Sequence, residues 1–385
     1  MTVQKVGVIG CTGSVGTAVV DVCRAYPERF RLTVLGAGHG GEKLAALGKE
    51  FRFAALAAAN GDGADPSLKL SAVGREMEDL FVSNAVDHLV IASSGVSAVR
   101  LLDRALKLGK TVSLANKESA VLLGPSISGP CLACQLRPLD SEHNAVWQCL
   151  KGEKSSDVKK IWLTASGGPF LRRDLSSFGS ITPQEAVSHP VWSMGAKISV
   201  DSATMINKGI EVIEASYLFG LPSERVSPVI LPGSFVHGGV QFADGVLKLL
   251  AGTPNMRQSA MNCLMYPDRP KNRIPDLAPI GLGGQSLTFS LPEPERYPGL
   301  FLCLDAARRG GVWPLIVLAG DQTAVDAFLA GQIGFNRIAQ VLGETLASYD
   351  GPASLESLDD RLALYASAGA AAQKAAAGNL KRWSY

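Results

Sequence analysis

The 385-residue chain has almost no net charge and carries no recognisable export or membrane segment. Its formal charge is +2 and charged residues make up 19%, so it lacks the basic surplus that a nucleic-acid-binding face needs. The N-terminus runs directly into an apolar strand pattern, without the regions of a signal peptide. Apolar stretches are interrupted well before the ~18 residues of a membrane span. We therefore expect a cytoplasmic protein whose partners are small molecules, with no nucleic acid and no membrane among them.

A disulfide or zinc pattern is also lacking. The cysteines are odd in number and scattered, which predicts reduced thiols in the cytosol. Cys131 and Cys134 have a short spacing, but no second cysteine or histidine pair stands at zinc-binding distance, and their neighbours are apolar. We expect these two thiols to be buried packing residues. The seven positions are Cys11, Cys23, Cys131, Cys134, Cys149, Cys263 and Cys303.

The length of the chain exceeds the ~250–300 residues at which one hydrophobic core stops growing, so more than one packed unit is expected. Before residue 140, strand and helix patterns alternate, which predicts an α/β fold with a doubly wound, Rossmann-like domain over residues 1–139. The expected strands are 3–10, 31–35, 88–92 and 111–114, and the expected helices are 17–25, 42–49 and 96–108.

Beyond residue 139 the pattern changes. Short strands among loops rich in Gly, Ser and Pro predict a central α+β domain over 140–266. Proline and glycine dominate residues 267–301, which we interpret as a linker, and helical patterns predict a C-terminal helical bundle over 302–385. The expected strands are 160–164, 197–200, 229–231 and 246–250, and the expected helices are 323–332, 337–348 and 357–378.

Glycines recur at every third position in Gly10–Gly16, immediately after the first strand and at the start of a helix. Backbone N–H groups at such a turn can hold the pyrophosphate of a dinucleotide; the alternative is a tight connection without a ligand. An NAD-specific fold usually carries an acid after its second strand, but Gly36–Gly41 contains none. NADPH is therefore favoured over NADH, although only His39 and Lys43 could meet a 2′-phosphate.

Two carboxylates, Asp140 and Glu142, stand two residues apart and would face the same side of an extended segment. Hard oxygen ligands of this kind suit Mg²⁺ or Mn²⁺. An exposed turn or a helix cap would give the same sequence, so a third carboxylate is needed to favour a metal site.

Glu211 is the candidate for the third carboxylate. It stands four residues after Asn207, so both would share one helix face. Lys208 and Ser202 add a cation and a hydroxyl, a combination that suits an anionic phosphate beside a metal. The alternative is an ordinary solvated helix with Glu211 and Glu214 pointing outward. A further hydroxyl, Ser166, lies on a Gly-rich turn, and His189–Gly195 could fold an aromatic lid over a ligand.

Together these blocks resemble the 1-deoxy-D-xylulose 5-phosphate reductoisomerase family, in that family's order and over nearly the whole chain. The resemblance implies a homodimer that uses NADPH and a divalent metal to convert this phosphorylated sugar into 2-C-methyl-D-erythritol 4-phosphate, a step in isoprenoid synthesis. The blocks are Gly10–Gly16, Leu114–Ser119, Leu139–Ala145, Ala165–Phe170, His189–Gly195 and Lys197–Glu211.

The resemblance also implies a role for each matching residue. Asp140, Glu142 and Glu211 would bind the metal, and Lys117 and Ser141 would hold the substrate's oxygens near it. The phosphate end would be bound by Ser166, His189, Ser202, Asn207 and Lys208, under a flap with Trp192 and Met194. The catalytic set would be Lys117, Glu142, His189 and Glu211. The cofactor would lie along Gly10, Thr12, Gly13, Ser14, Val15, Gly16, Gly38, His39, Gly40, Asn116, Glu118 and Gly195.

The chain departs from the family pattern at a few positions. A His-Pro-Gln-Ser block is replaced by Leu231–Ser234, with His237 retained, and an Ala-Ala-Asn-Glu run becomes Ala319–Gln322. The segment after Gly252 is also altered, whereas all the metal and phosphate positions are kept. Three interpretations remain: an active reductoisomerase, a relative that acts on a different sugar-phosphate, and a non-catalytic ligand-binding relative. The third interpretation, a non-catalytic relative, is disfavoured because such a protein would have little need for all three predicted metal ligands.

Overall fold

The computed structural model describes residues 3–62, 64–188, 195–233, 235–271 and 287–378. The chain divides into two compact units. Unit 1 comprises Met1–Trp147 and Asn255–Ala278, and unit 2 comprises Gln148–Pro254 and Pro279–Tyr385. The division into four sequence segments stays a prediction. Among the described helices, none combines the length and the apolar character needed to cross a membrane.

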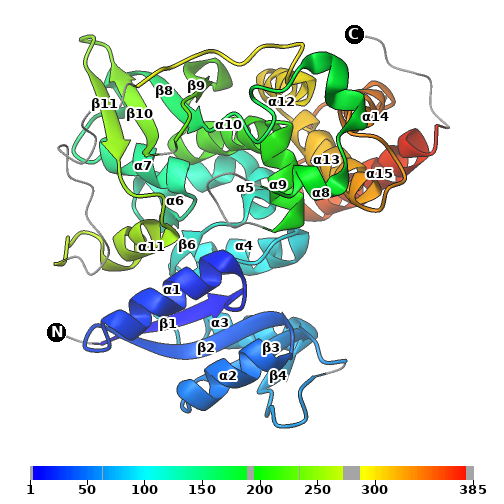
Figure 1. Cartoon of the computed structure of the whole chain (residues 1–385). Coiled ribbons are helices and arrows are strands. Elements are labelled where there is room, and N and C mark those ends of the chain that lie inside the picture. Colours follow the sequence, from blue (N-terminus) through cyan, green and yellow to red (C-terminus); the bar gives the residue numbers. More distant parts are fainter. Residues whose placement is uncertain (1–2, 63, 189–194, 234, 272–286, 379–385) are drawn as a thin grey trace. The chain divides into compact units, whose positions relative to one another are not determined.

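Unit 1 is built on a seven-stranded parallel sheet with strand order β4-β3-β2-β1-β5-β6-β7 (Figure 1). This confirms the predicted Rossmann-like fold. The central strands are almost continuously apolar and buried, as expected for a parallel sheet covered on both faces. The strands are β1 Gln4–Ile9, β2 Phe30–His39, β3 Ala55–Asn60, β4 Ala72–Val73, β5 His88–Ile91, β6 Thr111–Leu114 and β7 Leu136–Pro138.

The strand order reverses at β1, which pairs with β2 on one side and with β5 on the other. In open α/β sheets a ligand binds at the carboxyl ends of the strands at such a point. The helices of this part of the chain are α1 Ser14–Ala25, α2 Glu42–Glu50, α3 Met77–Val82, α4 Val99–Lys107, α5 Lys117–Leu123, α6 Ser128–Leu132, α7 Ser141–Cys149 and α11 Met256–Met265.

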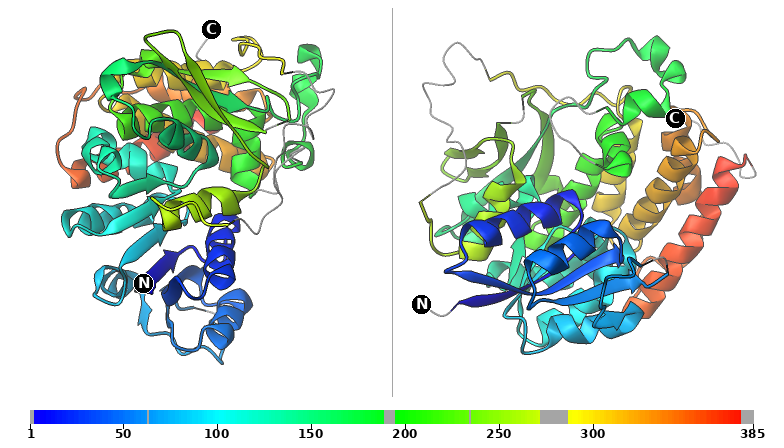
Figure 2. Two further views of the ribbon diagram at one scale, coloured as in Figure 1. Left: turned by 90° about the vertical axis from the view of Figure 1, so that its left-hand side faces the viewer. Right: turned by 60° about the horizontal axis from the view of Figure 1, so that its bottom comes forward.

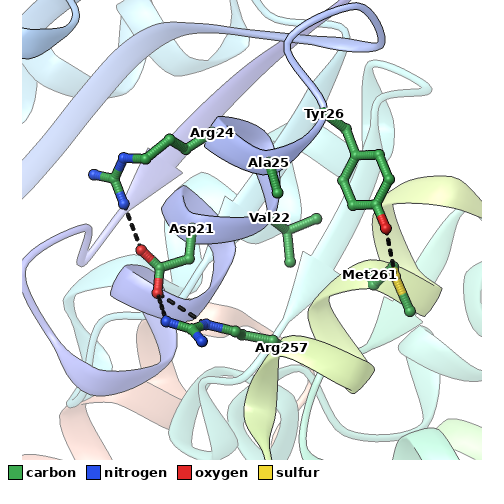
Figure 3. A pocket seen from close by; sticks show the side chains of 7 residues that line it. All are labelled: Asp21, Val22, Arg24, Ala25, Tyr26, Arg257 and Met261. Atoms are coloured by element: carbon green, nitrogen blue, oxygen red, sulfur yellow. Dashed lines mark hydrogen bonds and ion pairs between the residues drawn. The ribbon is translucent and has the colours of Figure 1, made fainter. Parts of the chain in front are cut away.

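Helix α11 returns to unit 1 from far along the chain and lies beside α1 (Figures 1 and 2). A cavity of about 330 Å³ lies between them (Figure 3). Asp21 accepts hydrogen bonds from Arg24 at 2.5 Å and from Arg257 Nε at 2.9 Å, so both arginines of the cavity wall share one carboxylate. None of the predicted site residues lines this cavity. We interpret it as a seam between packed helices.

Unit 2 contains a four-stranded mixed sheet with the order β11-β10-β8-β9, in which only β8 and β9 are parallel. The strands are β8 Val158–Ala165, β9 Val226–Ile230, β10 Val236–Phe242 and β11 Leu247–Ala251. Helices α13, α14 and α15 pack side by side in the C-terminal region, which confirms the predicted helical bundle (Figure 1). The helices are α8 Pro183–Ala186, α9 Ala196–Ala203, α10 Ile206–Phe219, α12 Pro298–Arg309, α13 Trp313–Leu329, α14 Arg337–Ala347 and α15 Leu358–Ala376.

Two local predictions were wrong. The strand predicted over 197–200 is part of helix α9, which buries Ser199 and Ala203, four residues apart. The β-branched pair Ile198 and Val200 suggested a strand, but helical packing overrides this weak propensity. The extended segment predicted around Asp140 is the start of helix α7, where the Asn144 N–H donates to the Asp140 carbonyl at 2.8 Å.

Several boundaries also differ from the prediction. Strand β2 continues to His39, four residues beyond the predicted end. Helix α12 begins at Pro298, inside the predicted linker, and α13 begins ten residues before the predicted helix. Proline at the first helical position favours the helix start in α12, because its missing N–H would have had no partner there.

Candidate active site

The Gly-rich turn is shaped by close backbone contacts at the carboxyl end of β1. Gly10 has φ +82°, and a β-carbon there would lie 2.5 Å from the Ala92 carbonyl carbon. A β-carbon on Gly16 would lie 2.1 Å from the Gly10 carbonyl oxygen. Gly13 is exposed and precedes the first residue of α1. Only glycine fits at positions 10 and 16, and the exposed helix N-terminus offers N–H groups and a positive dipole to an anion.

Asn116 uses its side chain to organise the neighbouring loop. Its Nδ2 donates to the carbonyls of Ser93 at 2.7 Å and Gly95 at 2.8 Å, and its Oδ1 accepts from the Ser119 N–H at 2.6 Å. Asn116 is therefore the N-cap of α5 and holds the loop after β5 beside the Gly-rich turn. This role is one of positioning, and it was not visible in the sequence.

The turn after β2 is the predicted cofactor-specificity segment. Gly38 and His39 are exposed, and a β-carbon on Gly38 would meet open space. Gly40 is buried, and its carbonyl accepts from the Asp65 N–H at 2.7 Å. His39 is the last residue of β2 and is exposed at the carboxyl end of the strand.

Lys117 and Asp140 form an ion pair in unit 1, with 13% and 14% of the side chains exposed. Lys117 begins α5 and Asp140 immediately precedes α7, so two predicted site residues meet at adjacent helix starts. Two further predicted site residues, Ser141 and Glu142, are also in contact, because the Ser141 hydroxyl donates to the Glu142 carboxylate. Carboxylates are favoured at the N-terminus of a helix by its dipole.

In unit 2, the Gly-rich turn after β8 packs against helix α9. Gly167 and Gly168 have φ of +83° and +70°, and a β-carbon on Gly168 would lie 2.6 Å from the Ser202 carbonyl oxygen. The Gly168 N–H donates to the Ser166 hydroxyl at 3.2 Å. Two residues predicted to bind phosphate, Ser166 and Ser202, therefore lie on directly contacting segments.

Helix α10 carries the other predicted residues of unit 2. Glu211 accepts from Asn207 Nδ2 at 2.5 Å and forms an ion pair with Lys208. Glu211 is only 1% exposed and Glu214 is equally buried, which rules out the solvated helix with outward-facing glutamates. A buried carboxylate requires such partners, because an isolated ion in the interior is strongly disfavoured.

An ion-pair cluster that the sequence analysis missed lies beside these residues. Lys197 bonds Asp201 at 2.6 Å on α9 and Asp321 at 2.5 Å on α13. Burial alone would lower the pKa of Lys197, but the two carboxylates raise it well above the usual lysine value. The four-residue spacing of Lys197 and Asp201 could have indicated their pair. Asp321 belongs to the run that departs from the family pattern and could not be placed from sequence.

Some predicted residues cannot be placed. His189, Trp192 and Met194 lie outside the described residues, as does Ser234. Gly195 is exposed and precedes α9, and Glu118 lies in the first turn of α5. Thr12, Ser14 and Val15 follow the strand end at the Gly-rich turn. Cys131 is buried and Cys134 is partly buried, and none of the seven cysteines, all in the described part of the chain, forms a disulfide.

Comparison with known proteins places the chain in a family. Family models described as 1-deoxy-D-xylulose 5-phosphate reductoisomerase and as its C-terminal domain match residues 6–124 and 136–219, and a DXP reductoisomerase C-terminal domain matches 251–370. The reductoisomerase of Cupriavidus metallidurans is 40% identical, covering 96% of this chain and 97% of its own. The chain belongs to the 1-deoxy-D-xylulose 5-phosphate reductoisomerase family.

Solved structures agree with this assignment. The Zymomonas mobilis reductoisomerase in complex with NADPH is 33% identical and has a TM-score of 0.87, with 97% of this chain and 99% of that chain covered. A DOX-P reductoisomerase in complex with NADPH, fosmidomycin and magnesium has the same identity and TM-score, with coverages of 97% and 98%. The prediction of an NADPH- and metal-dependent oxidoreductase of this family is confirmed.

Proposed function

We propose that this protein converts 1-deoxy-D-xylulose 5-phosphate into 2-C-methyl-D-erythritol 4-phosphate with NADPH and a divalent metal ion, using the residues described above. Family membership over almost the whole chain carries this proposal. The retained Lys208–Glu211 and Lys117–Asp140 pairs favour an active enzyme over a non-catalytic relative, because binding alone would not need these buried charges.

Asp140, Glu142 and Glu211 are the proposed metal ligands. Carboxylate oxygens suit Mg²⁺ and Mn²⁺, and three of them leave coordination positions for substrate oxygens. The donor set fits the ion because all three groups are carboxylates, and each is held in place by an ammonium or hydroxyl partner. When bound, the metal supplies polarisation of the substrate's carbonyl and hydroxyl oxygens.

The protein's own groups then bind and orient the substrate. Lys117 and Ser141 would hold its oxygens beside the metal ligands, and Ser166, Ser202, Asn207 and Lys208 would bind the phosphate. A phosphate fits this group because it offers several oxygens to hydroxyl, amide and ammonium donors. Fixing the phosphate end orients the carbon skeleton for rearrangement and for reduction by the nicotinamide.

NADPH would bind with its pyrophosphate at Gly10–Gly16. The close backbone contacts at Gly10 and Gly16 support this, since they form a tight turn that leaves Gly13 and Ser14 exposed at the start of α1. Asn116 would fix the loop after β5 beside the Gly-rich turn, and His39 would lie near the 2′-phosphate.

Changing His39 to glutamate should reverse the cofactor preference. A carboxylate at the last residue of β2 would bond the ribose hydroxyls of NADH and repel the 2′-phosphate of NADPH. We expect the kcat/KM ratio of NADPH to NADH to fall by at least about tenfold. Steady-state kinetics with both cofactors measures it, with Glu42→Gln as a charge control on the neighbouring helix. An unchanged ratio in His39→Glu would remove His39 from the cofactor site.

The reaction itself is tested with purified protein, NADPH, Mn²⁺ and 1-deoxy-D-xylulose 5-phosphate. Loss of NADPH absorbance and identification of the product as 2-C-methyl-D-erythritol 4-phosphate would support the proposal. Oxidation of NADPH only with another sugar-phosphate would instead identify a relative with a different substrate, for which the altered Leu231–Ser234 segment gives a reason. Binding without any turnover would indicate a non-catalytic relative.

The proposed assembly is a homodimer, as the family resemblance implies. Strand β11 is an edge of the unit 2 sheet, and its apolar side chains are solvent-exposed, with Leu247 49% and Leu249 36% accessible. Val246, immediately before the strand, is 51% exposed. Exposed apolar edge strands are usually covered by another chain, and a second copy is the occupant we propose. The proposed location is the cytoplasm, in keeping with seven cysteines that form no disulfide among the described residues.

Introducing a charge on this strand should produce a monomer. In Leu249→Asp, pairing of two copies would bury an unpaired carboxylate, which is strongly unfavourable. We expect the mass measured by light scattering after size-exclusion chromatography to halve. Leu132→Asp, at a leucine of unit 1 that is 50% exposed, is the control and should keep the wild-type mass. A wild-type protein that is already monomeric would refute the dimer.

A further inference from the structure

The turn between Ala165 and Phe170 is held at both ends by hydrogen bonds and, at Phe170, by ring packing. At its start, the Leu231 N–H donates to the Ala165 carbonyl at 2.8 Å. At its end, Phe170 packs edge-on against Phe335 with ring centroids 5.5 Å apart. Arg296 Nη1 also donates to the Phe170 carbonyl at 3.0 Å. These contacts fix the two ends of the segment that carries Ser166.

The middle of the turn consists of Gly167 and Gly168, both buried, and Gly168 lies against the Ser202 carbonyl of α9. Gly167 and Gly168 are consecutive, have positive φ and lack side chains, so their backbone would have a wide conformational range without an external contact. The hydroxyl of Tyr297 supplies one such contact to Gly167, because it donates to the Gly167 carbonyl at 2.9 Å. Tyr297 is 1% exposed, and burial raises the pKa of its hydroxyl to about 12, so the hydroxyl stays a proton donor at neutral pH.

The ring of Tyr297 packs near the second segment with proposed phosphate-binding residues, which is the junction of α9 and α10. It packs in one hydrophobic cluster with Met205 and Ile230. Met205 has φ +56° and joins α9, which carries Ser202, to α10, which carries Asn207 and Lys208. One side chain therefore bonds the Ser166 turn through its hydroxyl and shares a hydrophobic cluster with Met205 of the α9–α10 junction.

We propose that Tyr297 is a positioning residue for phosphate binding, holding the Gly167 carbonyl so that the Ser166 hydroxyl stays beside Ser202. This inference rests on the proposed phosphate site and adds a residue that lies 130 positions away from the turn it controls. The hydroxyl and the ring have separable effects, because the first orders the turn and the second orders the helix junction.

Tyr297→Phe tests the hydroxyl without changing the packing of the ring. We expect the inhibition constant of inorganic phosphate, competing with the sugar-phosphate, to rise by about tenfold, the effect of one lost buried hydrogen bond. The KM of the sugar-phosphate should rise by the same factor, whereas the KM of NADPH should not change. Tyr349→Phe is the matched control, because Tyr349 is only partly buried and also donates to a backbone carbonyl, that of Pro352, at 2.8 Å.

A double-mutant cycle with Ser166→Ala identifies the route of the effect. If Tyr297 acts through Ser166, Tyr297→Phe will add no further loss of phosphate affinity in the Ser166→Ala background. Additive losses would overturn the proposal, as would unchanged phosphate inhibition in Tyr297→Phe or an equal rise in the KM of NADPH. A wild-type enzyme without turnover or phosphate inhibition would contradict the proposed function instead, so the two failures are distinguishable.

Discussion

Replacing Glu211 with glutamine should abolish turnover while leaving NADPH binding nearly unchanged. Glutamine keeps the shape of the side chain and a hydrogen-bond acceptor for Asn207, but it removes the negative charge that a divalent ion needs. We expect kcat to fall by about 10³-fold or more, because a misplaced metal cannot polarise the substrate's oxygens. The measurements are kcat with saturating Mn²⁺ and the Mn²⁺ affinity by titration calorimetry.

The control for this variant is Glu224→Gln, which makes the same chemical change at an exposed glutamate of unit 2. It should keep wild-type kcat and metal affinity. Glu211→Gln also leaves the buried ammonium of Lys208 without its carboxylate, so the melting temperature must be measured to show that the variant is folded. A folded Glu211→Gln enzyme with near wild-type kcat would exclude Glu211 as a metal ligand.

The second large effect is expected for Lys208→Met. The side chain of Lys208 is 5% exposed and paired with Glu211, so its ammonium is already removed from water. Such an ammonium would bind a phosphate oxyanion in place of water. Its loss should raise the KM of the sugar-phosphate by about 100-fold, as expected when a buried charge-assisted contact is removed. Steady-state kinetics at saturating NADPH and Mn²⁺ measures this change.

The same ion pair predicts an interaction between metal and anion. When a metal takes the Glu211 carboxylate, the Lys208 ammonium needs a new anionic partner, so Mn²⁺ should strengthen inhibition by inorganic phosphate in the wild type. Linkage requires phosphate to strengthen Mn²⁺ binding by the same factor, typically between about 5- and 150-fold. Lys107→Met, which removes an exposed lysine paired with Asp103, should leave both values unchanged. Independent binding of Mn²⁺ and phosphate in the wild type would contradict this coupling.

Much of the site could be predicted because its residues are close in sequence. The spacing of Asn207 and Glu211 places them on one helix face, and the observed 2.5 Å hydrogen bond confirms that geometry. The Gly-rich turn was recognisable because glycine is required wherever backbones approach each other closely, as at Gly10 and Gly16. The failure at residues 197–200 has the opposite cause, since four residues carry too little periodicity to separate a strand from a helix.

The sequence by itself determined the alternation of strands and helices in unit 1, the family, and the residue types available for metal, phosphate and dinucleotide binding. Only the tertiary structure decided which of these groups are buried and what holds them in place. The burial of Glu211, the contact of Lys197 with Asp321 across 124 positions and the hydrogen bond from Tyr297 to Gly167 have no local signature. The physical reason is that helical and strand periods report neighbours within a few residues, whereas burial and long-range partners depend on how whole elements pack.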